Sequence, residues 1–377
     1  MGNESNKPQS LIQESSDAIR FVQKAALEWD RYKLFASETF LLVQPGILLT
    51  SGPDLQGEEF VPQALEEAVR HIKEEGLWMR YQHDPAVPPI GRLLDAGLFF
   101  APQTGLMFVA GVFGILDPSS VPSFSKIGIN TRSDYDPGPP PAEFEAPHLH
   151  VTLEYNKHEI APELVAEMLQ GAPPSVSKEP RLQFRKAADP FTIACFAIAS
   201  WPLWANPFAK KFLERFGEEA ANVVMAFSKW LGKEVAGRLK DGSRLVVSFN
   251  TRGCKVEFVL TTNEPSVVRE ASENVLKCLP QASQLISALL AYEPQRVVYL
   301  YDQEAKQWFP SFAETKKVGL IADTPKLISL EVFQSGGLSV GGSLERPDET
   351  PGSAPTSAAK SLPGSQKHSP EENDFLK

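Results

Sequence analysis

In the first part of the chain, two segments have apolar residues at helical spacing, and a segment with the pattern of a strand follows them. A helix is expected over residues 10–31, because Ser10 and Gln13 form a capping box at the start of a run of apolar residues at helical spacing. A second helix is expected over residues 62–76, which begin with proline and end with glycine. Residues 77–81 then predict a strand.

A nearly continuous apolar segment follows, with the sequence LFFAPQTGLMFVAGVFGIL over residues 98–116. Proline, glutamine, threonine and glycine in its middle indicate a turn, so the segment predicts a hairpin of strands that are buried on both faces. Residues 117–147 are rich in Pro, Ser, Gly and Asp and predict a long loop, which is typical of functional or disordered segments. A strand at 148–155 and a short helix at 163–169 complete this part.

Two helices that form a hairpin are expected at the start of the second half. The first spans residues 189–204, with a break at Pro202, and the second spans residues 207–240. Apolar residues of the second helix recur at steps of three and four and form one stripe. The stripe consists of Phe208, Phe212, Phe216, Ala220, Val223, Phe227, Leu231, Val235 and Leu239.

After residue 241 the apolar residues alternate with a period of two. This pattern predicts two strands, a helix that is bent or split at Pro280, and three more strands. In chain order these elements are 244–250, 255–261, 265–292, 295–301, 307–312 and 317–322. From residue 335 onward large apolar residues are scarce, so this segment is expected to be disordered.

These elements together predict an α+β protein in two folded parts. We expect a mixed α+β domain at residues 1–170 and a linker at 171–188. A helical hairpin packed on a small, mostly antiparallel sheet would follow at residues 189–334, and a disordered tail at 335–377.

The charge and the cysteines of the chain narrow the class of protein. The formal net charge is −10 and no basic stripe is present, so nucleic-acid binding is not expected. The three cysteines, Cys195, Cys254 and Cys278, are far apart, which indicates buried free thiols in a reducing compartment and no disulfide scaffold or zinc site. No motif for a cofactor is found. We therefore expect a cytoplasmic protein, either free or peripheral to a membrane.

One apolar segment, residues 190–209, carries no charge and is flanked by basic residues on both sides. Its interpretations are a buried core hairpin, a helix that contacts a protein partner or a membrane surface, and a membrane-inserted segment. Self-association into a homo-oligomer is compatible with the second interpretation. The candidate contact residues are Phe191, Phe196, Trp201, Trp204 and Phe208, with Arg185, Lys186, Lys210 and Lys211 as the flanking cations.

A candidate chemical site lies on the predicted strand 148–155. His148, His150 and Glu154 fall on one face of that strand, and two imidazoles with a carboxylate are ligand types that bind metals. The motif HVTL from His150 also resembles one half of the signature of two-histidine phosphoesterases, and that resemblance implies phosphodiester hydrolysis by two imidazoles. The chain has no second His-x-Ser/Thr element. The other interpretation of this strand is a solvent-facing edge strand.

An aromatic group in the predicted last sheet offers a third possibility. These side chains form either a ligand cleft or the core and rim of the sheet; they are Tyr299, Tyr301, Trp308, Phe309 and Phe312. The sequence favours a non-enzymatic interaction module that acts through the apolar segment 190–209. The alternatives are a metal-dependent or phosphoester hydrolase at the histidine strand, and a small-molecule sensor whose pocket is formed by the Pro-rich loop or the aromatic sheet.

Overall fold

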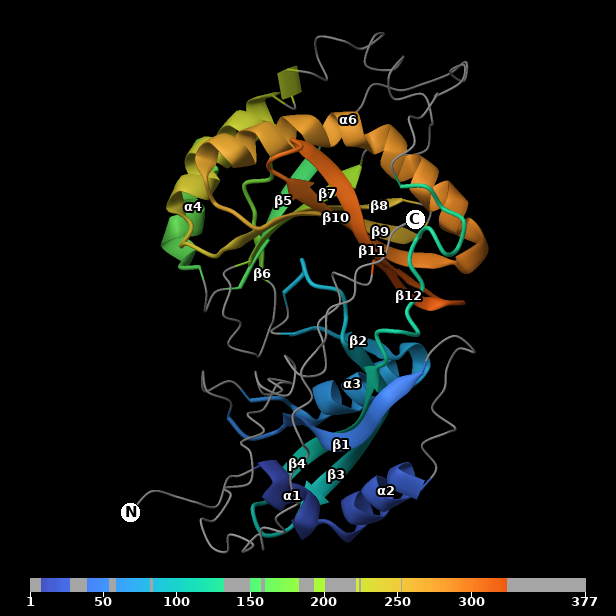
Figure 1. The fold of residues 1–377 in the computed structure, drawn as a ribbon. Coiled ribbons are helices and arrows are strands. Elements are labelled where there is room, and N and C mark those ends of the chain that lie inside the picture. The colour runs from blue at the N-terminus through green and yellow to red at the C-terminus, as the bar shows by residue number, and fades with distance from the viewer. Residues whose placement is uncertain are drawn as a thin grey trace, which may run out of the picture. The chain divides into compact units, whose positions relative to one another are not determined.

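The computed structural model of the chain confirms an α+β fold, with helices and two β-sheets (Figure 1). The residues that the structure describes are 8–27, 39–53, 59–81, 84–131, 150–156, 160–182, 193–200, 222–223, 225–251 and 253–323. The predicted tail at 335–377 lies outside these ranges.

The first sheet is antiparallel and has the strand order β1-β4-β3-β2. Its strands are β1 (Phe40–Thr50), β2 (Leu77–Met79), β3 (Gly91–Ala101) and β4 (Leu106–Leu116). The predicted hairpin is confirmed as β3 and β4, with Gly105 in a left-handed turn conformation at φ 72°. Strand β1 was not predicted, because Pro45 and Gly46 break its pattern; at the edge of a sheet a proline is tolerated.

Three helices accompany the first sheet. The helix expected at 10–31 is present as α1 (Pro8–Glu14) and α2 (Ser16–Leu27). Ser15 separates them, and its hydroxyl accepts a hydrogen bond from the Ala18 backbone amide as an N-cap. Helix α3 (Pro62–Glu75) confirms the second prediction and ends at Gly76, which has a φ of 61°.

The second sheet has eight strands in the order β12-β11-β10-β9-β8-β7-β5-β6. Its strands are β5 (His150–Tyr155), β6 (Arg181–Leu182), β7 (Ile193–Ser200), β8 (Arg244–Thr251), β9 (Cys254–Leu260), β10 (Pro294–Asp302), β11 (Gln307–Thr315) and β12 (Gly319–Ala322). The predicted order of two strands, a helix and three strands is confirmed from β8 to β12. Strand β5 pairs with β7, so strand pairing connects residues on both sides of the predicted linker.

The structure contradicts the predicted helix at 189–204 for the part that it describes. Residues Ile193–Ser200 form β7, which pairs with β5 on one side and with β8 on the other. A short apolar run without charges fits a strand that is covered on both faces as well as it fits a buried helix. The remaining residues of the apolar segment, 190–192 and 201–209, lie outside the described ranges.

The described part of the second predicted helix, residues 225–238, is helical and ends in a π-turn (Leu231–Val235) and a 3₁₀ turn (Ala236–Arg238). Its stripe residues Phe227, Leu231 and Val235 are buried, as predicted.

Helices cover one face of the second sheet. Helix α6 (Pro265–Leu289) is the longest and runs across the sheet in Figure 1; it is followed by a 3₁₀ turn at Leu290–Tyr292. It is continuous through Pro280, so of the two predicted alternatives, a bend or a split, the split is wrong. The short helix α4 (Pro162–Gln170) was predicted and contributes to the same core. The buried residues of the sheet therefore fall into a helix-covered core and a separate core on the opposite face.

Candidate functional site

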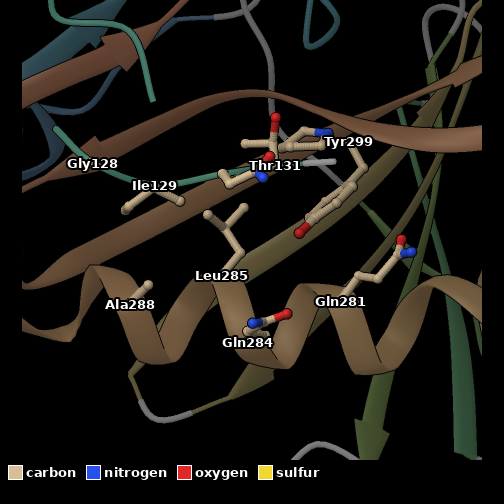
Figure 2. Close-up of a pocket in the computed structure, with 10 residues that line it drawn as sticks. Gly128, Ile129, Thr131, Gln281, Gln284, Leu285, Ala288 and Tyr299 are labelled. Carbon is tan, nitrogen blue, oxygen red and sulfur yellow. The ribbon is translucent and has the colours of Figure 1, made fainter. Parts of the chain in front are cut away.

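A cavity of about 240 Å³ lies between helix α6, strands β10 and β11, and the loop that follows β4. Figure 2 shows the side chains that surround it. The helix contributes Gln281, Gln284, Leu285 and Ala288, the strands contribute Tyr299 and Pro310, and the loop contributes Gly128, Ile129, Asn130 and Thr131. Tyr299 and Pro310 are register partners on the two antiparallel strands, so they form adjacent parts of one wall.

The loop wall is held in place by its own short turn and by a buried anchor. The Ser123 hydroxyl accepts a hydrogen bond from the Lys126 amide, which is the geometry of an N-cap. Gly128 has a φ of 79°, and the amides of Gly128 and Ile129 donate to the carbonyls of Ser125 and Phe124, which is the pattern of a Schellman motif. The Phe124 side chain is 2% exposed and belongs to the helix-covered core. The loop therefore presents Ile129 to the cavity from a defined turn.

Tyr299 is the most deeply buried polar side chain of the cavity. Only 1% of it is exposed, and Figure 2 shows its phenol oxygen at the helix-facing end of the ring, toward Leu285 and Gln281. Among the described residues, none makes a hydrogen bond with this hydroxyl. A buried hydroxyl without a partner is costly, and such groups are few in folded proteins. The Tyr299 oxygen is not one of the fully enclosed unpaired side-chain atoms among the described residues, so it is reached from the cavity, and a molecule that enters the cavity can be its hydrogen-bond partner.

An aromatic cluster fixes the Tyr299 ring. The ring stacks on Phe258 with 5.0 Å between the ring centroids, and Trp308 lies perpendicular to Phe258 with 4.9 Å between their centroids. The indole nitrogen of Trp308 donates to the Ala271 carbonyl of α6 at 2.9 Å. Because Phe258 and Trp308 are buried and the indole is hydrogen-bonded, the tyrosine ring is held in place with its hydroxyl on the cavity side.

Among the described residues, those that line the cavity are all uncharged at neutral pH. Burial raises the pKa of the Tyr299 phenol well above its usual value, so this side chain stays protonated. Gln281, Gln284 and Asn130 are exposed at the rim and carry amides, while Ile129, Leu285 and Pro310 supply apolar surface. The wall thus combines apolar contact with neutral hydrogen-bonding groups.

The two cysteines whose surroundings are described are poor nucleophiles. Burial raises the pKa of the Cys254 thiol to about 12, and burial also raises the pKa of Cys278. Both are free and buried, which agrees with the predicted role as core residues. Thiol chemistry at these two positions is therefore disfavoured.

The opposite face of the second sheet carries a buried ion network. Arg296 of β10 donates from Nε to Glu257 of β9 at 2.7 Å and from Nη1 to Glu314 of β11 at 2.8 Å. Arg80 donates to Glu314 at 2.6 Å, and the Lys255 Nζ lies 2.7 Å from Glu257. Burial alone would raise the pKa of Glu257, but Arg296 and Lys255 lower it to about 2. Each of the two carboxylates thus faces two cations, Arg296 and Lys255 for Glu257, and Arg296 and Arg80 for Glu314, which is typical of a structural network.

The predicted metal site is not tested as a group, because His148 lies outside the described residues. His150 and Glu154 belong to strand β5, which pairs with β7 on one side and with β6 on the other and is not an edge strand. Within the described ranges, no three His, Cys, Asp or Glu side chains gather as metal ligands.

Of the predicted partner contacts, only Phe196 falls in a described element, in β7. The others, namely Phe191, Trp201, Trp204, Phe208, Arg185, Lys186, Lys210 and Lys211, lie outside the described residues. No helix within the described ranges has both the length and the apolar character that a membrane crossing requires.

The cavity brings together two places that the sequence singled out separately. The Pro-rich loop supplies residues 128–131 and the aromatic group supplies Tyr299, whereas Trp308 packs in the core. The four helix residues were missed. Their spacing of 281, 284, 285 and 288 is that of one helix face, and two glutamines on a face shared with Leu285 were the available signal.

Comparison of the chain with protein-family models, curated proteins and solved structures finds no match.

Proposed function

We propose that this chain is a small-molecule binding protein and that its ligand site is the cavity between α6, β10, β11 and the loop 128–131. The observation that carries the proposal is Tyr299: its side chain is 1% exposed, it borders the cavity, and its hydroxyl hydrogen-bonds none of the described residues. A ligand that hydrogen-bonds this hydroxyl would remove the cost of burying it alone.

The cavity also has the character of a ligand pocket. Apolar walls with a few placed polar groups are typical of sites for small molecules. The ten described residues that line it include no Cys, His, Asp, Glu, Lys or Arg, so this part of the wall offers no thiol, charged acid–base pair or metal-binding group. This composition supports binding over catalysis, in agreement with the sensor alternative that the sequence offered.

Association through the segment 190–209 remains a prediction for residues outside the described ranges. Its helical face, on which that hypothesis depended, is replaced by strand β7 over residues 193–200. The hydrolase alternative likewise depends on His148, which is not described.

A fragment screen with a blocked cavity tests the proposal. Ala288 lies exposed on α6 at the rim, so Ala288→Trp would place an indole across the cavity without removing a core side chain. Ala291 is also exposed but does not line the cavity, so Ala291→Trp is the matched control.

A mixed fluorinated fragment library of neutral, anionic and cationic members is screened by ¹⁹F relaxation against the full-length chain and both variants. We expect fragments that bind the unaltered protein and Ala291→Trp but not Ala288→Trp. If every bound fragment binds all three proteins equally, or if no fragment binds, the cavity is not a ligand site.

A further inference from the structure

We infer that the ligand of this cavity is an uncharged molecule of one or two rings that carries an amide or lactam edge. This inference rests on the proposed binding function and specifies its ligand. It is drawn from the size of the cavity, from the neutral side chains in the described part of its wall, and from the kind of polar groups that these side chains offer.

The size of the cavity limits the ligand to a small molecule. Its volume is about 240 Å³. An apolar cavity of about 150 Å³ accepts benzene, whereas pockets for drug-sized ligands begin at about 300 Å³. The cavity lies between these values, so a ligand of one or two rings fits it.

The wall excludes a charged ligand from the inner part of the cavity. The ten lining residues in the described part of the chain are neutral, and the innermost of them is a tyrosine that lies beside Leu285 and Pro310. A carboxylate or an ammonium group placed there would lose its hydration without gaining an opposite charge. A neutral polar group would lose less, and Tyr299 can either donate a hydrogen bond to it or accept one from it.

The rim offers amides, which pair well with another amide. Gln281 and Gln284 are three residues apart on α6, and Figure 2 shows both on the helix side of the cavity. A side-chain amide presents a donor next to an acceptor, and so does the edge of an amide or lactam. A ring that bears such an edge can place its apolar part against Ile129 and Leu285 while its polar edge meets these groups.

Four probes of nearly equal size separate the properties of the ligand: 4-fluorobenzamide, 4-fluorobenzoate, 4-fluorobenzylamine and 4-fluorotoluene. They share the ring and the fluorine and differ in being neutral and polar, anionic, cationic, or neutral and apolar. Dissociation constants are measured at pH 7 by ¹⁹F relaxation on the full-length chain. For fragments of this size, an affinity on the order of millimolar is expected.

We expect 4-fluorobenzamide to bind most tightly and each of the other three to bind about tenfold more weakly. Tyr299→Phe should weaken 4-fluorobenzamide by about fivefold to tenfold and leave 4-fluorotoluene unchanged, because only the former uses the hydroxyl. Ala288→Trp should abolish binding of 4-fluorobenzamide, and Ala291→Trp should leave it unchanged.

Two results would overturn the inference on the ligand while leaving the binding function intact. One is tighter binding of the charged probes than of 4-fluorobenzamide at a site that Ala288→Trp blocks. The other is failure of all four probes when different library fragments bind at that site. Failure of every fragment at that site contradicts the proposed function itself.

Discussion

Replacement of Tyr299 by phenylalanine should stabilise the free protein while it weakens ligand binding. The Tyr299 side chain is 1% exposed and its hydroxyl hydrogen-bonds none of the described residues, so its hydration in the folded state is limited to what enters through the cavity. For a buried, unsatisfied polar group the cost of lost hydration is about 1–3 kcal/mol. Because the oxygen borders a cavity of about 240 Å³ that can admit water, the lower end of that range applies. The phenyl ring itself remains, so the stack on Phe258 is kept.

We therefore expect Tyr299→Phe to raise the free energy of unfolding by about 1 kcal/mol. This corresponds to an increase in Tm of about 3 °C for a domain of this size. Urea-induced unfolding followed by tryptophan fluorescence measures the change in the free energy of unfolding. The comparison with the unaltered protein is valid when both proteins have the same m-value.

Tyr301→Phe provides the matched control on the same strand. The Tyr301 hydroxyl accepts a hydrogen bond from the Asn274 side chain at 3.3 Å, so its removal should destabilise the protein by about 0.5–1 kcal/mol. The two substitutions delete the same atom and should change stability in opposite directions. A loss of stability in Tyr299→Phe as large as that in Tyr301→Phe would show that the Tyr299 hydroxyl has a partner inside the protein, and the argument for a ligand would fail.

Three further predictions concern the network and the loop. Arg296→Ala leaves two buried carboxylates without their shared cation and should lower the free energy of unfolding by about 3–5 kcal/mol. The control Arg70→Ala, which breaks the exposed pair with Glu67, should lower it by about 0.5 kcal/mol or less in the same urea assay. Equal losses would contradict the structural role of the network. The pKa of Glu257 is lowered from 4.5 to about 2 in the folded state, so its contribution of roughly 3 kcal/mol to the free energy of unfolding is fully present above pH 4.5 and is lost as the pH falls toward 2. When the free energy of unfolding is measured from pH 7 to 2, it should fall less steeply in this window for Glu257→Gln than for the unaltered protein. An unchanged slope would refute the assignment. Gly128→Ala should lower the free energy of unfolding by about 1 kcal/mol, because Gly128 has a φ of 79°. Gly128→Asn should lower it less, since asparagine tolerates the left-handed region. An equal loss for both variants would point to a steric cause.

Much of the fold follows from local patterns in the sequence. The hairpin of β3 and β4 and the elements from β8 to β12 have apolar patterns with clear turn residues, so their order could be predicted. Strand β7 could not be predicted, because an uncharged apolar run of this length is equally compatible with a buried helix and with a strand that is buried on both faces. Its assignment depends on pairing with β5 and β8, which are 50 residues or so away in opposite directions along the chain.

The candidate site was only partly accessible from the sequence. Tyr299 and the Pro-rich loop were noted for different reasons, and nothing local indicates that they meet. Their meeting depends on the long-range burial of Phe124 against the second sheet and on the crossing of α6 over β10. Gln281 and Gln284 look like ordinary surface residues of an amphipathic helix until the loop is placed opposite them.

The central claim is that the Tyr299 hydroxyl meets a ligand inside the cavity, and tyrosine carbon NMR tests it most directly. The chain is labelled with ¹³C at the tyrosine Cζ position, and the Tyr299 signal is assigned by its loss in Tyr299→Phe. On addition of a fragment that Ala288→Trp excludes, we predict that the Tyr299 signal shifts while the signals of the other tyrosines stay in place. A bound fragment that leaves the Tyr299 signal unmoved would contradict the claim.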